Sequence, residues 1–240
     1  MQAPIPILVY HQIDTPPARG TPLRGLVVAP QSFAWQMALL RMLGFQGLSM
    51  RDLEPYLSGE KTGRVVGITF DDGYRNNLDH ALPILQRYGH TATCYAVSDL
   101  IGKTNAWDDG LVATQPLMNL EEWRRWLDGG MDVGSHTCRH VDLQTCDDIT
   151  AQREMRDSRL ALEDGLHVPV RHFCYPYGRM NPVHADRARQ AGYLTATTMR
   201  RGRAWPTHDR WQLPRVMVAC ATNPIQMLLK LLTRYEDRRG

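Results

Sequence analysis

The feature that most constrains the fold is a regular alternation of short apolar segments with longer amphipathic ones along nearly all of the 240 residues. The short segments are apolar and β-branched, as buried strands are, whereas the longer ones carry apolar residues at helical spacing. Strands that alternate with helices join as parallel βαβ units, so the chain predicts an α/β protein. The sheet could be open and doubly wound or closed into a barrel, and periodicity does not choose between the two.

The individual elements follow from these patterns. The expected strands cover residues 5–10, 65–70, 91–97, 131–134, 172–175, 194–198 and 216–219. The expected helices cover residues 33–43, 51–57, 77–88, 120–127, 150–164, 182–191 and 223–235. Ser32 can cap the first helix, because a serine hydroxyl accepts hydrogen bonds from the free N–H groups of a first turn. No linker interrupts the series, so we expect one domain over residues 1–240.

Composition excludes several classes of protein. Hydrophobic residues make up 43% and charged residues 22%, which is unlike a disordered chain. No apolar run reaches the roughly 18 residues needed to cross a bilayer. The net charge of +3 is too small to favour a nucleic-acid partner. The five cysteines include no Cys-x-x-Cys pair, so neither a disulfide framework nor a zinc ribbon is expected. The oligomeric state stays open.

The first ten residues predict a cytoplasmic location. They contain neither a basic segment nor an apolar stretch long enough for a signal peptide. This expectation assumes that the protein begins at Met1.

The first polar cluster, Thr-Phe-Asp-Asp-Gly at residues 69–73, ends the expected strand at 65–70. Functional sites of parallel α/β proteins collect at the carboxyl ends of strands. Neighbouring side chains of a strand point in different directions, so one of Asp71 and Asp72 can ligate a metal while the other faces a substrate. The alternative is a turn with both carboxylates in solvent.

Two more clusters follow expected strands. His136 and His140, in Ser-His-Thr-Cys-Arg-His at 135–140, have a spacing that lets two imidazoles reach one ion. With an aspartate they make a two-histidine, one-carboxylate set that leaves positions open for water and substrate. The alternative is two surface histidines at chance spacing. The third cluster, Phe-Cys-Tyr-Pro-Tyr-Gly at 173–178, could wall a pocket or present a backbone N–H to an oxyanion, or could simply pack on the core.

Together these motifs resemble the polysaccharide deacetylase family, also known as the NodB homology domain or carbohydrate esterase family 4. The resemblance rests on Thr-Phe-Asp-Asp-Gly, His-Thr-x-x-His and Tyr-Pro-Tyr-Gly in this order, and it covers residues from about 5 to 218. It implies a distorted (β/α) barrel of about seven strands with one metal ion. The implied activity is metal-dependent N-deacetylation of N-acetylated amino sugars in a polysaccharide or a glycan precursor.

The resemblance also implies roles for individual residues. The implied metal ligands are Asp72, His136 and His140. The ion would be divalent; zinc is expected, and cobalt, nickel or iron would also suit these ligands. Asp71 would be the general base, and Tyr177 would supply a backbone N–H to the oxyanion hole. Thr137 would orient the second histidine from outside the ligand set.

The sequence departs from the family pattern in two places. Cys174 occupies a position where the third motif commonly has arginine. The usual late Leu-x-His motif, which supplies the general acid, is missing, and His208 is the only histidine after the third motif in a plausible region. His11 fits the role better, because Tyr-His-x-Ile at 10–13 resembles a permuted branch of the family that includes poly-N-acetylglucosamine deacetylases. His11 could also be a capping or core histidine.

Arg215 is the remaining candidate in the catalytic set. It could pair with Asp71 and hold that carboxylate ionised, or it could be an ordinary surface arginine. Trp107 lies in an irregular segment that could wall a sugar groove or form a surface loop.

Two other functions stay open. The same scaffold could hydrolyse a lipid-linked sugar, a lipopolysaccharide sugar or a small non-sugar amide. It could also be a non-catalytic sugar-binding module. The intact set of Asp71, Asp72, His136 and His140 argues against the binding module, because a binder needs no general base.

Overall fold

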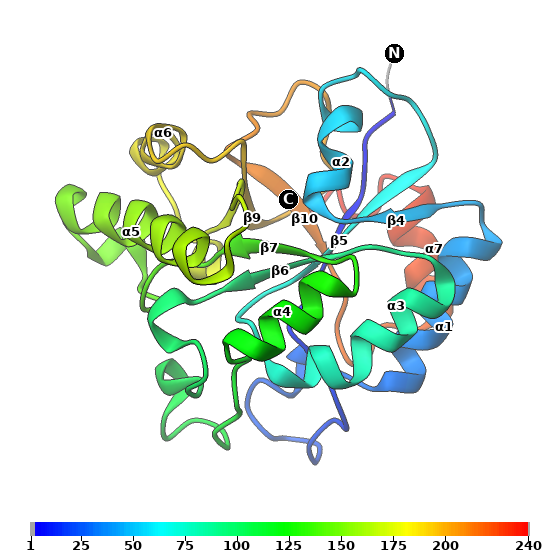
Figure 1. Ribbon diagram of the computed structural model, residues 1–240. Helices are drawn as coiled ribbons and strands as arrows, with labels where there is room; N and C mark the ends of the chain where they lie inside the picture. The colour runs from blue at the N-terminus through cyan, green and yellow to red at the C-terminus, as the bar shows by residue number, and fades with distance from the viewer. Residues whose placement is uncertain (1–2, 240) are drawn as a thin grey trace.

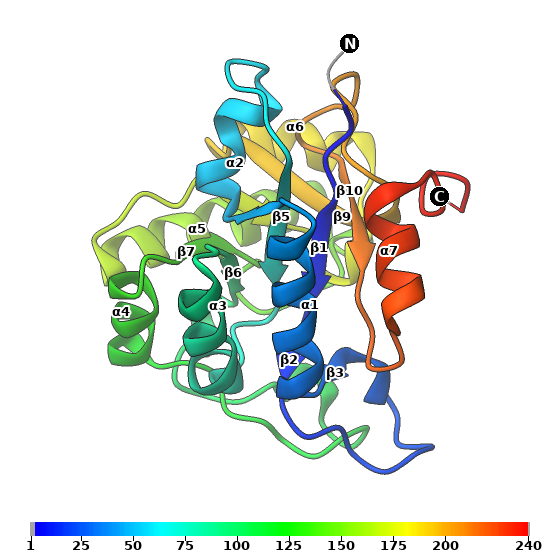
Figure 2. The same cartoon turned by 90° about the vertical axis from the view of Figure 1, so that its right-hand side faces the viewer.

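The computed structural model describes residues 3–239, which form a barrel of parallel strands with helices around its outside (Figures 1 and 2). The strands are β1 (Ile7–Tyr10), β2 (Gln12–Ile13), β3 (Val27–Val28), β4 (Gln46–Leu48), β5 (Val65–Phe70), β6 (Thr93–Ala96), β7 (Asp132–Ser135), β8 (His172–Cys174), β9 (Thr195–Arg201) and β10 (Leu213–Met217). The α-helices are α1 (Pro30–Met42), α2 (Met50–Leu57), α3 (Leu82–Tyr88), α4 (Leu120–Asp128), α5 (Asp148–Leu166), α6 (Pro182–Gln190) and α7 (Pro224–Leu232). No helix within the described residues is long and apolar enough to span a membrane.

The barrel closes through β1, which pairs in parallel on both of its edges. Leu8 lies in register with Ile68 of β5 on one edge and with Val216 of β10 on the other. The circuit runs β1-β10-β9-β8-β7-β6-β5 and returns to β1, and its pairings are parallel. This seven-stranded circuit confirms the expected distorted (β/α) barrel, and it excludes the open doubly wound sheet.

The distortion is visible at β5, which has two partners on one edge. Its first half pairs with β4, and its second half pairs with β1. The fork lies at Gly67, where an added Cβ would meet side-chain atoms of Leu53 and Ile7 at 3.1–3.2 Å. Glycine therefore allows the close approach that closes the barrel. The sequence did not predict β4, which spans only three residues and carries no strong strand pattern.

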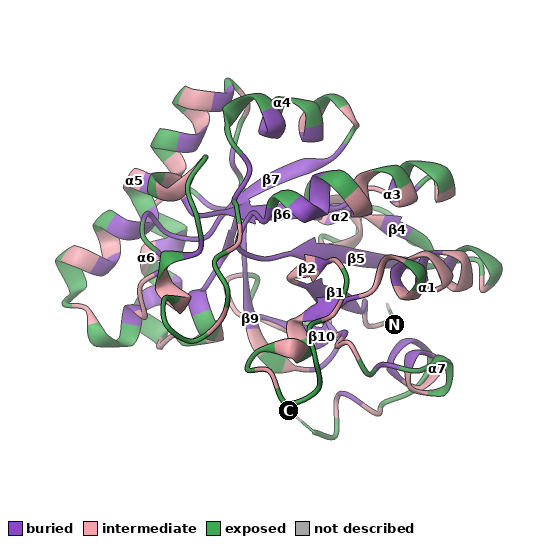
Figure 3. Ribbon diagram, turned by 90° about the horizontal axis from the view of Figure 1, so that it is seen from below, coloured by how far each residue is buried: buried purple, intermediate pink, exposed green. Residues whose placement is uncertain are grey.

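The strand side chains divide between two apolar layers. Residues such as Leu8, Ile68 and Val216 face outward and pack under the helices in the larger cluster of buried side chains. The alternate residues face the barrel interior, where Ile7 and Tyr95 pack with Met50 and Leu53 of α2. Figure 3 shows the result, with buried strands surrounded by helices that are each exposed on one side.

Several predicted boundaries are wrong, and a proline lies at two of them. Helix α1 begins at Pro30 with Ala29 as its N-cap, and Ser32 makes no capping bond. A proline suits the first helical position, because its fixed φ is already helical and it has no N–H to leave unpaired. Strand β10 begins at Leu213, earlier than expected, and it contains Pro214 at a shift in register against β9. Proline is tolerated in a strand at such an irregularity.

Candidate active site

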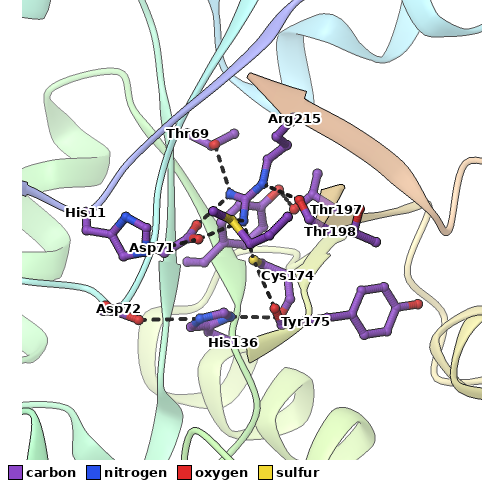
Figure 4. A network of polar contacts seen from close by, with 12 residues as sticks. His11, Thr69, Asp71, Asp72, His136, Cys174, Tyr175, Thr197, Thr198 and Arg215 are labelled. Carbon is purple, nitrogen blue, oxygen red and sulfur yellow. Dashed lines mark hydrogen bonds and ion pairs between the residues drawn. The ribbon is translucent and has the colours of Figure 1, made fainter. Parts of the chain in front are cut away.

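Polar residues from four parallel strands of the barrel meet at one of its rims. His11 follows β1, Asp71 and Asp72 follow β5, His136 follows β7, and Cys174 ends β8. Parallel strands of a barrel present their carboxyl ends at the same face, so these side chains converge although they come from distant parts of the chain. Figure 4 shows them around one centre.

Asp71 is held by Arg215, which projects from β10 into the barrel. Arg215 Nη1 donates to Asp71 Oδ1 and Nη2 donates to Oδ2, each at 2.7 Å. Arg215 is only 1% exposed and Asp71 3%, so the surface reading of Arg215 is wrong. Burial alone would raise the pKa of Asp71, but the charge and hydrogen bonds of Arg215 outweigh it and lower that pKa. The carboxylate is therefore ionised at neutral pH.

Cys174, at the position that departs from the family pattern, also contacts this pair. Its Sγ lies 3.1 Å from Arg215 Nη2. Arg215 Nε is also bonded to the carbonyl oxygen of Thr198, and Nη1 contacts Thr69 Oγ1. The arginine that reaches Asp71 in this chain thus comes from β10, and the smaller cysteine on β8 lies against its guanidinium.

His11 lies on the other side of Asp71, with Nε2 3.9 Å from Asp71 Oδ2. Asn77 clamps the backbone around it: Asn77 Nδ2 donates to the His11 carbonyl, and Asn77 Oδ1 accepts from the Ile13 N–H. Sequence reasoning missed Asn77, which is fully buried in a π-helical turn (Asn77–Ala81) before α3. His208 lines a cavity with Ile5 and Leu213, at the end where strands begin, so it lies away from these residues.

Asp72, His136 and His140 form a second group beside Asp71. Asp72 Oδ1 lies 3.4 Å from His136 Nε2 and 3.3 Å from His140 Nε2, and all three residues are buried. A tetrahedral zinc ion with bonds of about 2.0–2.2 Å places its ligand atoms roughly 3.3–3.6 Å apart. Two imidazoles and one carboxylate are also the donors that zinc and similar divalent metals accept. The three residues therefore fit one divalent ion in both chemistry and spacing.

The charges in this group are consistent with a cation site. Burial would raise the pKa of Asp72, but hydrogen-bonding contacts with His136 and His140 lower it strongly. Burial lowers the pKa of His140, which favours the neutral ring that ligates metals. For His136, burial acts to lower the pKa, yet the neighbouring Cys174 and Asp72 groups raise it.

The backbone around the histidines has an unusual conformation. Three residues lie in the left-handed region, Asp72 at φ 75°, Thr137 at φ 67° and His140 at φ 59°. The His136 ring is fixed by a 2.7 Å contact between Nδ1 and the Cys174 carbonyl. The Thr137 hydroxyl accepts a hydrogen bond from the His140 backbone N–H at 2.9 Å, so it orients that residue through its backbone and not through its ring.

Tyr177 follows β8 in a short turn (Pro176–Gly178) and also has a left-handed backbone, with φ 58°. Its N–H has no hydrogen-bond acceptor among residues 3–239. Its ring packs edge-on against His140, with centroids 4.7 Å apart. The turn therefore carries an unpaired backbone donor in a residue whose ring contacts one of the proposed metal ligands.

Trp107 reaches the site from an irregular segment. Its ring stacks on that of His140 with centroids 4.2 Å apart. Of the two readings of this segment, the structure favours the wall of the site. Trp107 itself is only partly buried.

A cavity of about 150 Å³ opens next to these residues. Its lining includes Gln12, Tyr74 and Asp108, which are close in the chain to His11, Asp72 and Trp107. About 150 Å³ is the size of an engineered cavity that holds one benzene molecule.

Comparisons with known proteins identify related chains. The family model described as polysaccharide deacetylase matches residues 58–196 of the chain. That range contains Asp71, Asp72, His136 and His140, and it leaves out His11 and Arg215.

The chain is also similar to individual proteins. It is 30% identical over 219 residues to YxkH of Bacillus subtilis (strain 168), whose name assigns it to the polysaccharide deacetylases; the match covers 90% of this chain and 72% of YxkH. It is 24% identical over 226 residues to the poly-beta-1,6-N-acetyl-D-glucosamine N-deacetylase of Staphylococcus epidermidis, covering 90% of this chain and 76% of that protein. The structure of Streptococcus pyogenes deacetylase PplD in complex with acetate superimposes with a TM-score of 0.84 at 26% identity, covering 96% of this chain and 99% of that one.

Proposed function

Since the chain belongs to the polysaccharide deacetylase family, we propose that it is a metal-dependent N-deacetylase of N-acetylated amino sugars in a polysaccharide or a glycan precursor. The observation that carries the proposal is the adjacency of two groups. Asp72, His136 and His140 can hold one divalent ion, and Asp71 lies beside them as an ionised, arginine-paired carboxylate.

Each residue has a chemical task in this proposal. Asp71 accepts a proton from the water that attacks the acetamide carbonyl. The Tyr177 N–H donates to the oxygen on which negative charge develops, an interaction worth about 2.7–4 kcal/mol in other enzymes. His11, as an imidazolium, donates a proton to the departing nitrogen, because an amine is expelled only after protonation. The C–N bond breaks, and the products are acetate and a free amino sugar.

A divalent metal ion would be held by Asp72, His136 and His140. A divalent ion bound there would supply Lewis acidity to the acyl oxygen and would lower the pKa of water. Zinc is the metal we propose first, and cobalt, nickel and iron also suit two imidazoles and a carboxylate.

The substrate is proposed from the fold and from the relatives. A cavity of about 150 Å³ is lined by Gln12, Tyr74 and Asp108, and we propose that it receives part of the sugar chain. Poly-β-1,6-linked N-acetylglucosamine, named for the Staphylococcus epidermidis relative, is the first polymer to test.

The test is acetate release from N-acetylglucosamine oligomers, from that polymer and from lipid-linked sugars and small acetamides, with and without a chelator. Chelator-sensitive release from the sugar oligomers supports the proposal. Release only from the lipid-linked or non-sugar amides would reassign the substrate. Metal binding without hydrolysis of any acylated sugar would instead indicate a binding module.

A further inference from the structure

The segment that carries His136 and His140 is strained and needs external support. Thr137 and His140 both have left-handed backbones, which L-residues with side chains adopt only at a cost in free energy. Such a conformation persists where surrounding contacts hold it in place. The partners of this segment therefore decide whether the two imidazoles stay together.

The two histidine rings are held differently. His136 has a polar partner for its second nitrogen, the carbonyl of Cys174. His140 Nδ1 is buried and has no hydrogen-bond partner within residues 3–239. Metal-bound histidines usually donate this second N–H to a carboxylate, a carbonyl or water, which fixes the ring. The position of His140 therefore depends on its backbone and on the rings that pack against it.

Glu154 of α5 supplies that backbone support. It is 3% exposed, and its Oε2 accepts hydrogen bonds from the backbone N–H groups of Cys138 and Arg139 at 2.9 and 3.1 Å. Its Oε1 accepts from Arg139 Nε at 2.7 Å. A buried carboxylate that bonds two successive N–H groups fixes the path of the backbone between the two histidines.

One turn further along α5, Ser158 makes a second connection. Its hydroxyl donates to the Thr137 carbonyl at 3.0 Å and contacts the Ser135 hydroxyl at 2.8 Å. Helix α5 packs beside β7, which leads into the segment (Figure 1). Helix α5 thus contacts residues 135–139 through the side chains of Glu154 and Ser158. Of these two side chains, only Glu154 is charged.

We propose that Glu154 is a positioning residue for the metal site: it holds the backbone between His136 and His140 so that both rings face Asp72. This inference rests on the proposed metal-binding function. Glu154 itself contacts none of the three proposed ligand side chains, so its effect on the metal passes through the backbone.

The test is metal affinity and not activity alone. Zinc and cobalt dissociation constants are measured on metal-free protein by competition with a chromophoric chelator, and the visible spectrum of the cobalt-loaded protein reports the coordination geometry. Glu154→Ala leaves two N–H groups without an acceptor, and we expect metal affinity to fall 10- to 100-fold, as for other residues that support metal ligands. The cobalt spectrum should change as well.

Two further variants separate positioning from general stability. Glu154→Gln keeps an oxygen that accepts both N–H bonds, so it should restore affinity to within a few-fold of the unchanged protein. Arg139→Gln removes the guanidinium but leaves both backbone N–H bonds to Glu154 in place, so affinity and spectrum should stay unchanged. Where Glu154→Ala does not fold, Glu154→Asp replaces it, since the shorter side chain retreats from the N–H groups.

The outcomes are distinguishable. If the unchanged protein binds neither zinc nor cobalt, the proposed function fails. If it binds metal and Glu154→Ala, or Glu154→Asp in its place, retains the same affinity and spectrum, the positioning role of Glu154 is overturned while the proposed function stands.

Discussion

Arg215 and Asp71 face each other inside the barrel, joined by two parallel hydrogen bonds of 2.7 Å each, although they lie 144 residues apart in the chain. An unpaired carboxylate at such a buried place would take up a proton. Arginine does not lose its proton at any ordinary pH, so this partner keeps Asp71 ionised. The pairing therefore gives the proposed base its charge.

Replacing Arg215 with methionine tests this relationship through pH. Removing the cation leaves burial to raise the pKa of Asp71. A base works only above its pKa, so the acid limb of the kcat/KM profile should move to higher pH. Below that limb, kcat/KM should fall about tenfold per pH unit. The measurement is acetate release against pH at saturating metal.

The same substitution should cost stability. An uncompensated buried charge destabilises a fold by about 3–5 kcal/mol, which denaturant unfolding at neutral pH would show. Arg215→Lys keeps the charge but loses the two-pronged geometry, so both effects should be smaller. An acid limb that stays in place in the methionine variant would contradict the role of Arg215.

His11→Ala tests the proposed general acid. Loss of a general acid typically costs about 10²–10⁴-fold in rate, and the loss should be largest where the leaving group is an amine. An activated aryl acetate has a leaving group that departs without protonation, so its hydrolysis should fall far less. The comparison is kcat/KM on the two substrates with the same enzyme preparation.

His208→Ala is the matched control, since His208 lies at the opposite end of the barrel. It should leave both rates unchanged. Equal losses on amide and aryl ester in His11→Ala would remove His11 from the role of acid.

Asp71→Asn should separate catalysis from metal binding. The amide cannot accept the proton, so acetate release should fall by about 10²–10⁴-fold. The ligand set of Asp72, His136 and His140 is untouched, so metal content should stay near that of the unchanged protein. Loss of the metal in this variant would show that Asp71 belongs to the ligand set.

Gly178→Ala should disturb the turn that presents the Tyr177 N–H. Gly178 has φ 68°, and an added Cβ would collide with the backbone nitrogen of Met199. We expect the turn to shift and kcat to fall by about 10²–10³-fold, the usual cost of losing one oxyanion donor. KM and metal content should change little. Unchanged kcat would argue against a donor in this turn.

Strand-end positions made much of this site predictable. Asp71, Asp72 and His136 each follow a short apolar run, and parallel strands bring such positions to one rim whatever their separation in sequence. Barrel closure could not be inferred from periodicity, because the pairing of β1 with both β5 and β10 is a long-range contact. The family resemblance was needed to predict it.

The supporting residues were not predictable in the same way. Asn77 and Glu154 lie on helical turns whose pattern indicates only burial or solvent, and their bonds to the backbone of other segments depend on the tertiary packing. Trp107 lies in an irregular segment without periodicity, so its stacking on His140 had no sequence signal beyond residue type. The sequence indicated Arg215 as a candidate partner for Asp71, but it did not indicate that the side chain would be buried.

The most direct test of the central proposal is elemental analysis of the purified protein, paired with acetate release from N-acetylglucosamine oligomers before and after chelation. We predict about one divalent ion per chain, loss of acetate release when the ion is removed, and recovery when zinc or cobalt is returned. His136→Ala and His140→Ala should lose both the ion and the activity. Acetate release that continues undiminished in metal-free protein would contradict the proposal.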